Sequence, residues 1–423
     1  MSEKEGTLIR RFKVVVNRNI LTRTLGLNLQ KRIQIAKYPH NTNSQARRTP
    51  KAHVAAWQGL SSVQTPATPK QMKTPKTMIP VYHHLWFFLL LLLFTFLVLS
   101  TCLVKANHNS LLHRIPVHDN AFIKLINKFT NQRWQAGVNN VFANMTLGQI
   151  QQQISRNSIS LRERDPFQPN VLPSFHKRCS NLPIEYSLLS DPLYFNCTQL
   201  HSIRHDMNCG CWAFAIAEAV GDRFCVTSKT LINHVLSPQW LISCDKNDGG
   251  CESGSFDTGL QFVEQVGLVT ESCVPFEAND NMACPSYCSN NGQPITRTFK
   301  TTHSRLFNVT DMESVQRSIL SSGTIIAGMK VYRDFLNYKS GVYHHVAGSW
   351  LFNLAVKIVG WGVQQGTGVP YWIAANSWSS EWGMNGYFLI ARNQNECELE
   401  MNMWETTPVL PSQPYSMLEK KWN

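Results

Sequence analysis

Two cysteines separated by one glycine, Cys209-Gly210-Cys211, precede an almost wholly apolar run that extends to Cys225. A run this apolar and this long predicts a buried helix rather than a surface one. A cysteine in the first turn of a helix lies where the helix dipole and the free backbone N–H groups favour a thiolate and a developing oxyanion. The stretch therefore indicates a nucleophilic thiol beside a second cysteine, and the spacing alone leaves open which of the two forms a disulfide.

The residues after Cys211 resemble the nucleophile helix of papain-type cysteine peptidases, and most of all that of cathepsin B. Trp-Ala-Phe directly after Cys211 matches the family signature and favours Cys211 as the nucleophile. The resemblance covers residues 182–410. It implies an α+β, papain-like fold in two parts, a helical half built on the nucleophile helix and a β-barrel half, with the active site between them. The family has two residues between its paired cysteines, whereas this chain has only Gly210.

Three runs rich in β-branched and aromatic residues, 355–362, 371–375 and 386–391, predict strands of the β-barrel half. Asn376 follows the second run in the sequence Asn-Ser-Trp. The resemblance identifies Asn376 as the asparagine that orients a catalytic histidine in this family.

Two other members of the family's catalytic machinery are absent. A papain-type site needs a thiolate, a histidine that activates it, an asparagine that orients the histidine, and a glutamine side chain that stabilises the oxyanion. Leu354 stands at the histidine position of the resemblance, and a leucine can neither take nor return a proton. Asp206 stands at the glutamine position, where a carboxylate repels an oxyanion and raises the pKa of a nearby thiol.

These losses predict a pseudoprotease that keeps the fold as a binding or structural module for a protein or peptide ligand in the cleft. Losing one member of a cooperating catalytic group costs roughly 10⁴- to 10⁶-fold in turnover. The alternative is an active cysteine endopeptidase that uses Cys211 with a displaced base. His344 and His345 are the nearest candidates, but Gly341-Val-Tyr-His-His resembles a structural turn of the family barrel. Neither a cofactor nor a metal is expected.

Several features concern the ligand rather than the chemistry. Cys273 and Cys288 enclose fourteen residues and no histidine, which does not support the carboxydipeptidase loop of cathepsin B. Glu400 matches the acid at the base of the family's S2 pocket, with a solvated surface glutamate as the alternative. The resemblance assigns substrate binding to Gly210, Gly254, Trp378 and Glu400.

The cysteines fit an oxidising compartment, because eleven of the twelve lie after residue 106. Spacing and the family resemblance together imply four disulfides and leave Cys211 and Cys397 outside them. The implied pairs are Cys197–Cys225, Cys209–Cys251, Cys244–Cys284 and Cys273–Cys288.

The net charge of +13 lies in the first 77 residues, which hold 15 of the 40 Lys and Arg and 2 of the 27 Asp and Glu. Residues 1–77 read as a basic, disordered leader, as an organellar transit peptide, or as a segment that is not translated if synthesis starts at Met78. Since residues 78–423 carry no net charge, no nucleic-acid surface is expected there.

Residues 78–106 read as a signal peptide or signal anchor. Their block 85–104 is uncharged and long enough to cross a bilayer if it is not cleaved. The basic residues before it predict a lumenal or extracellular remainder. We therefore expect a secreted, lysosome-like or extracellular product, or a single-pass membrane protein with a lumenal or extracellular C-terminus. Glycosylation sequons at Asn144, Asn196 and Asn308 all lie beyond the block.

Residues 107–181 resemble the cathepsin B propeptide and precede the peptidase domain, 182–423. The best match is 123–137, which physically predicts a weakly amphipathic helix ending in the aromatic anchor Trp134. A stalk helix that packs on the main domain is the alternative.

Overall fold

The computed structural model describes residues 90–98, 111–154, 158–162, 181–207 and 209–411. The basic leader 1–77 lies outside these ranges, and of the apolar block 85–104 only 90–98 lies within them, as a helix with exposed side chains. None of the helices in the described ranges combines the length and apolar character needed to cross a bilayer.

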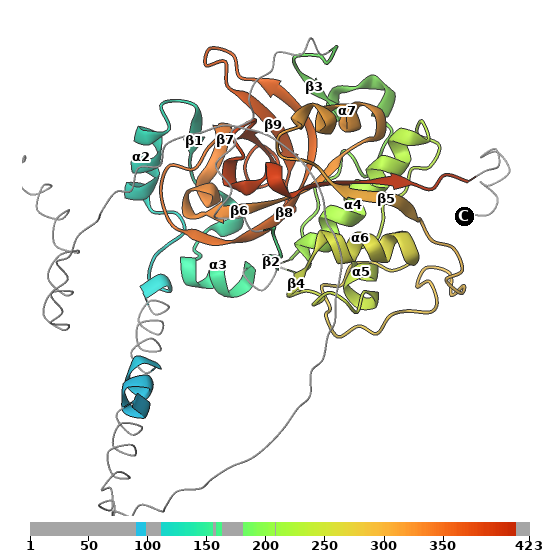
Figure 1. The fold of residues 1–423 in the computed structure, drawn as a ribbon, viewed down its shortest axis with the longest axis horizontal. Coiled ribbons are helices and arrows are strands. Elements are labelled where there is room, and N and C mark those ends of the chain that lie inside the picture. Colours follow the sequence, from blue (N-terminus) through green and yellow to red (C-terminus); the bar gives the residue numbers. More distant parts are fainter. Residues whose placement is uncertain (1–89, 99–110, 155–157, 163–180, 208, 412–423) are drawn as a thin grey trace, which may run out of the picture. The chain divides into compact units, whose positions relative to one another are not determined.

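Helix α4, Cys211–Thr227, is the predicted nucleophile helix, and every residue from Cys211 to Val226 is buried. Burial on all sides explains why its sequence is apolar throughout rather than along one face. Figure 1 shows α4 grouped with α5, Pro238–Cys244, and α6, Phe256–Gln265, beside the sheet. Helix α7, Met312–Ser322, packs on the sheet. The short helices begin at side-chain caps, which supply acceptors for free N–H groups of the first turn: Ser237 for α5, Ser255 for α6 and Asp311 for α7.

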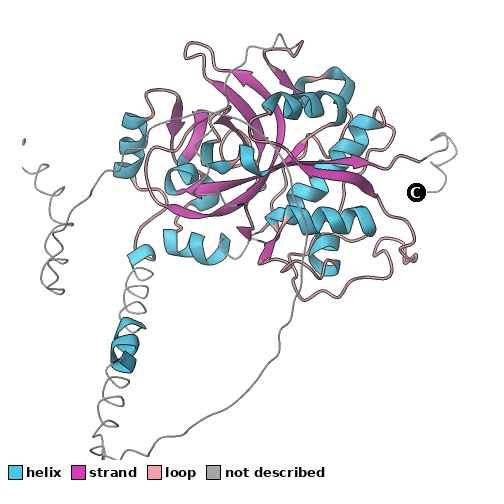
Figure 2. Ribbon diagram, in the orientation of Figure 1, coloured by secondary structure: helices cyan, strands magenta, loops and turns pink. Residues whose placement is uncertain are grey.

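The other half is a sheet in the order β1-β7-β10-β9-β8-β6-β11-β5, with β3 paired to β8. Its long central strand β8, Trp350–Val363, pairs with β6 and β9, and Figure 2 draws the strands of this half in magenta. Strand β8 is buried along most of its length. The remaining strands of this sheet are β1 Trp134–Ala136, β3 Tyr186–Ser187, β5 Thr301–Leu306, β6 Ile325–Tyr332, β7 Tyr338–Tyr343, β9 Pro370–Ala375, β10 Tyr387–Ala391 and β11 Met403–Pro408. Short 3₁₀ turns occupy Asn140–Phe142, Leu188–Ser190, Pro192–Tyr194, Arg333–Asn337, Glu396–Glu398 and Glu400–Asn402.

A buried ion cluster joins the two halves. The Nζ atom of Lys357, on β8, lies 3.2 Å from Glu218 Oε2 and 3.1 Å from Asp222 Oδ2, both on α4. Thr324 donates a further hydrogen bond of 2.9 Å to Asp222. Burial raises the pKa of Asp222 to about 6 in spite of the nearby lysine. The two acidic residues of the apolar helix therefore hold it to the central strand.

Four disulfides join cysteines within the described ranges, and they are the four pairs that the sequence implies. Cys211 and Cys397 remain thiols, and both are buried.

The propeptide-like residues pack on the β half. Helix α2, Asn120–Phe129, is followed by β1, which extends the sheet by pairing with β7. The predicted aromatic anchor, Trp134, is buried on β1, and its Nε1 donates to the His344 carbonyl at 3.0 Å. The chain then runs through α3, Leu147–Ile154, to the two-residue strand β2, Ser158–Ile159, which pairs with β4, Ser253–Gly254.

Candidate active site

The start of α4 is fixed by Gly210. This residue has a left-handed backbone, with φ of +73°, and its N–H donates to the Cys251 carbonyl at 3.3 Å. A Cβ here would lie 2.7 Å from a methyl group of Ile242, so glycine is required for both its conformation and its size. Together with the Cys209–Cys251 disulfide, this contact sets the first turn of the helix and hence the position of Cys211.

The Cys211 thiol is fully buried in an environment that opposes its ionisation. Burial raises its pKa well above the ordinary range, and the charge of Asp206 raises it further. Backbone N–H groups of Ala355 and Trp212 hydrogen-bond the sulfur and oppose that increase only in part. The helix dipole and these amides thus act on a thiol whose ionisation its surroundings oppose.

Leu354 directly precedes Ala355, whose backbone N–H contacts the Cys211 sulfur. Leu354 is 1% exposed and lies opposite Met329 on β6. Its side chain is part of the hydrophobic core. A buried leucine therefore occupies the position before the amide that contacts the thiol, where the resemblance implies an imidazole.

Asp206 and Asn376 are brought to the same place by a backbone pairing. The Asp206 N–H donates to the Ser377 carbonyl at 3.0 Å, and the Ser377 hydroxyl donates to Asp206 Oδ2 at 2.9 Å. Asn376 Oδ1 accepts the Ser377 N–H at 2.8 Å, while its buried Nδ2 has no hydrogen-bond partner among the described residues. Buried amide groups normally find a partner. The resemblance assigns Asn376 to orienting a histidine, but the histidine position is Leu354, and the Asn376 NH₂ group has no acceptor among the described residues.

His344 and His345 hold the turn after β7. His345 Nδ1 lies 3.1 Å from both oxygens of the buried Asp334, and its ring stacks on Tyr332 with centroids 3.9 Å apart. The His344 carbonyl accepts a hydrogen bond from the Trp134 indole N–H. Burial lowers the pKa of the half-buried His344 ring. These contacts agree with the structural turn that the sequence suggests.

Residues 251–254, which include Gly254 and form a backbone strip beside α4, are paired with the chain's own residues 158–160. In the parallel pairing of β2 with β4, the Ser158 N–H donates to the Glu252 carbonyl at 3.2 Å and the Ser160 N–H donates to the Gly254 carbonyl at 2.9 Å. A Cβ on Gly254 would lie 2.2 Å from the Trp212 ring, so only glycine lets the strip lie this close to α4. Trp378, also assigned to substrate binding, is buried and meets Phe142 of the propeptide-like segment edge to face at 5.2 Å.

The structure gives Glu400 a different environment from the one expected. Its carboxylate is fully buried and accepts hydrogen bonds from the Trp372 indole at 3.0 Å and from the backbone N–H groups of Asn393 and Asn395. These bonds hold the turn before β11. The side chain that reaches the segment in the cleft is instead Asn402, two residues later. Asn353 also contacts this segment, and sequence reasoning singled out neither asparagine.

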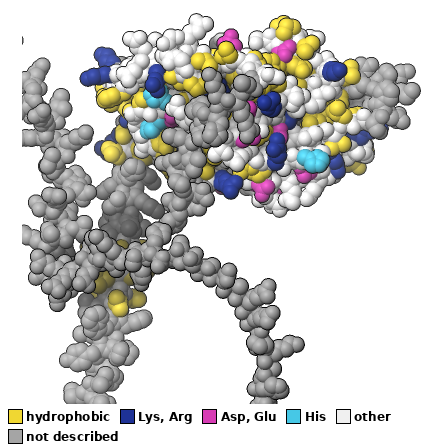
Figure 3. Space-filling view, turned by 45° about the horizontal axis from the view of Figure 1, so that its top comes forward, with side chains coloured by type: hydrophobic (Ala, Val, Ile, Leu, Met, Phe, Trp, Pro, Cys, Tyr) yellow, Lys and Arg dark blue, Asp and Glu magenta, His cyan; other side chains and the backbone are white. Residues whose placement is uncertain are grey.

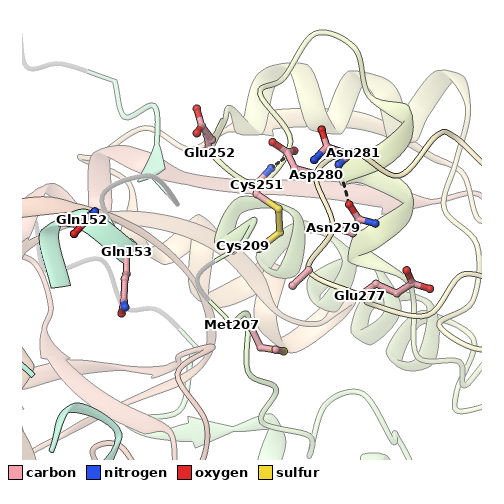
Figure 4. A pocket seen from close by; sticks show the side chains of 11 residues that line it. Gln152, Gln153, Met207, Cys209, Cys251, Glu252, Glu277, Asn279, Asp280 and Asn281 are labelled. Atoms are coloured by element: carbon pink, nitrogen blue, oxygen red, sulfur yellow. Dashed lines mark hydrogen bonds between the residues drawn. A yellow bond between two sulfur atoms is a disulfide. The ribbon is translucent and has the colours of Figure 1, made fainter. Parts of the chain in front are cut away.

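A groove of about 860 Å³ lies beside the occupied strip, between α3 and the Cys209–Cys251 disulfide (Figure 4). Its lining is polar and carries carboxylates: Gln152, Gln153, Met207, Cys209, Cys251, Glu252, Glu277, Ala278, Asn279, Asp280 and Asn281. On the face shown in Figure 3, basic and acidic side chains are interspersed rather than separated by sign.

Comparison with known proteins identifies the lineage of this site. The model of the family described as papain family cysteine protease matches residues 194–407. The chain belongs to the papain family of cysteine proteases. Within that family it is cathepsin B-like. It is 38% identical over 235 residues to cathepsin B-like cysteine proteinase 4 of Caenorhabditis elegans, a match that covers 48% of this chain and 70% of the relative.

Two further similarities extend into the propeptide-like residues. The chain is 31% identical over 277 residues to cathepsin B-like CP3 of Giardia intestinalis, covering 64% of this chain and 89% of the relative. Among solved structures, procathepsin B S9 of Trypanosoma congolense matches with a TM-score of 0.59 and 28% identity, over 70% of this chain and all of that one. This papain-family chain therefore has the fold of a proenzyme.

Proposed function

We propose that this papain-family chain is a catalytically inactive, cathepsin B-like protein that acts as a binding or structural module of the secretory pathway. The observation that carries the proposal is Leu354, a core leucine that directly precedes Ala355, whose backbone N–H contacts the Cys211 sulfur. Without an imidazolium partner a thiol keeps a pKa near ~8.5 or higher, and only a few per cent of it is thiolate at neutral pH. Asp206 adds a charge of the wrong sign for both the thiolate and an oxyanion.

The alternative of a displaced base finds little support in the contacts of the two nearby histidines. His345 is held by Asp334 and Tyr332, and His344 carries the carbonyl that anchors Trp134. Recruiting either ring would require breaking the turn that buries the propeptide-like anchor.

Alkylation of Cys211 by iodoacetamide is expected to be slow at pH 5 and to increase through pH 8 to 9. The reason is that burial and Asp206 both raise the thiol pKa, so that the reactive thiolate accumulates only in alkaline solution. The rate is measured by mass spectrometry of the peptide that contains Cys211. Cys397→Ser removes the other buried thiol, and Cys211→Ala gives the background. Rapid labelling at pH 5 by a papain-directed epoxide, with peptide hydrolysis that disappears in Cys211→Ala, would refute the proposal.

Glycosidase treatment of the expressed protein is expected to increase its mobility on a gel. The three sequon asparagines, Asn144, Asn196 and Asn308, are all exposed in the structure and hence open to modification. Replacing each by glutamine in turn should remove one increment of apparent mass. A product that is unglycosylated and found in the cytosol or mitochondria would contradict the assignment to the secretory pathway.

A further inference from the structure

Two large apolar side chains are exposed where the chain leaves the 3₁₀ segment Pro192–Tyr194. The exposed fraction is 72% for Leu193 and 60% for Phe195. The Phe195 ring meets the ring of His201, which is also exposed, with centroids 6.3 Å apart. An exposed apolar side chain needs no partner by itself. What the neighbouring residue carries decides whether this ring is covered.

The turn that carries the ring is held in place by covalent and hydrogen bonds. The Cys197–Cys225 disulfide ties it to helix α4. Asn233 holds the backbone on both sides of the disulfide: its Oδ1 accepts the Thr198 N–H at 2.9 Å, and its Nδ2 donates to the Asn196 carbonyl. Asn196 itself is exposed. A group attached to its side chain would therefore lie beside a fixed surface, and little ordering of the chain would oppose a contact.

Two of the three glycosylation sequons have a phenylalanine directly before the asparagine, and the third has an alanine there. The ring before Asn308 is that of Phe307, which is only 4% exposed. The guanidinium of Arg305 lies 4.9 Å from the centre of that ring. The ring before Asn196 is that of Phe195, which is open to solvent. Among the described residues, the combination of a sugar acceptor and an open aromatic ring directly before it thus occurs at Asn196.

We propose that the carbohydrate attached to Asn196 packs on the Phe195 ring, and that its first N-acetylglucosamine unit is the occupant of this exposed apolar surface. The proposal rests on the proposed function, which places the chain in the secretory pathway. Attachment joins Asn196 Nδ2 to C1 of the sugar; the lipid pyrophosphate of the oligosaccharide donor leaves, and the amide loses one proton.

The contact has a defined chemistry. One face of a pyranose ring carries C–H groups, which are apolar and slightly positive, and these suit the negative face of an aromatic ring. Covering the ring removes apolar surface from water, which favours the folded protein. The sugar bonded directly to Asn196 is the unit nearest to Phe195, so one sugar is enough for the contact. The carbohydrate at Asn308 should have no comparable effect, because Phe307 is already buried.

Hydroxyl-radical labelling of the full chain, followed by mass spectrometry, tests whether the ring is covered. The protein is produced in a eukaryotic secretory host with high-mannose carbohydrate. We expect Phe195 to be labelled several-fold more slowly in the wild type than in Asn196→Gln. Wild type trimmed by endoglycosidase H to one sugar at each site should keep this protection. Asn308→Gln is the matched control and should leave the labelling of Phe195 unchanged.

Thermal unfolding tests whether the contact stabilises the protein. Asn196→Gln should lower the Tm by about 2–4 °C, the scale set by one aromatic contact in a domain of this size. Phe195→Ala, an exposed change, should lower the Tm of the glycosylated protein by a similar amount. The double variant should be no less stable than either single variant, because both remove the same contact. Asn308→Gln should leave the Tm unchanged.

Each opposite result has its own meaning. Equal labelling of Phe195 in wild type and Asn196→Gln, or sugar at Asn144 and Asn308 but not at Asn196, would overturn the contact and leave the proposed function standing. Labelling in Asn196→Gln that falls as the protein concentration rises would assign the ring to a second copy of the chain, which also overturns it. A chain without sugar at any sequon would overturn the secretory assignment together with the contact. Hydrolysis that depends on Cys211 would overturn the proposed inactivity and leave the contact standing.

Discussion

Leu354→His is expected to leave the chain without peptidase activity above that of Cys211→Ala. An imidazole at 354 restores the base, but Asp206 still lies beside the thiol and raises its pKa. Members of a catalytic group act as a unit, so a single restored member recovers little of a loss of about 10⁴- to 10⁶-fold. The shortened Cys-Gly-Cys link adds to this, because Gly210 and the Cys209–Cys251 disulfide set the start of the helix.

The measurement is the hydrolysis of fluorogenic peptides by wild type, Leu354→His, Asp206→Gln and the double variant. Since residues 158–160 occupy the strip, each protein is also assayed after limited proteolysis. We expect the double variant to exceed both single variants, because it alone combines a base with a site free of the opposing charge. Full family-like activity in Leu354→His alone would show that the histidine was the only missing part.

Lys357→Met is expected to lower the free energy of unfolding by about 3–5 kcal/mol, the usual cost of removing one partner of a buried ion pair. The lysine is 1% exposed and faces Glu218 and Asp222, whose remaining carboxylate oxygens have no hydrogen-bond partner in the described structure. Methionine fills similar space but leaves two buried negative charges. Urea unfolding measures the change, with Lys330→Met as the control because its ion pair with Glu398 is about one-third exposed at the lysine.

The loss should depend on pH. The folded-state pKa of Asp222, about 6, lies above its value in the unfolded chain, so protonation favours the folded state. The stability that this group contributes is present below pH ~4 and is lost as pH rises through 6. Lys357→Met should therefore be less harmful at pH 5 than at pH 7.5. If Lys357→Met lowered the free energy of unfolding equally at pH 5 and pH 7.5, Glu218 and Asp222 would have found other partners.

The sequence predicts those parts of the fold that depend on local pattern. The apolar run after Cys211 becomes α4, and the runs at 355–362 and 371–375 lie within β8 and β9. The resemblance supplies the four disulfide pairs. The helix and the strands follow from patterns of residues close together in the chain, and the disulfides follow from motifs that the family shares.

The contents of the cleft depend on contacts that no local pattern records. Asn353 and Ile159 are 194 residues apart, and Arg162 and Asn402 are 240 apart. An asparagine in a sequence does not reveal which distant backbone group it meets. Glu400 illustrates the same limit, since the left-handed residues Asn395 and Cys397 turn its carboxylate inward among backbone N–H groups.

The burial of Leu354 has a consequence for the history of the site. A core leucine opposite Met329 contributes to stability, and replacing a buried aliphatic side chain by one that is polar or of another shape costs free energy of about 1–3 kcal/mol. A lineage that regained histidine at this position would meet that cost at once, while any catalytic benefit would wait for a second change at Asp206. If the chain is inactive as proposed, the stability of the core at position 354 opposes the return of a histidine there.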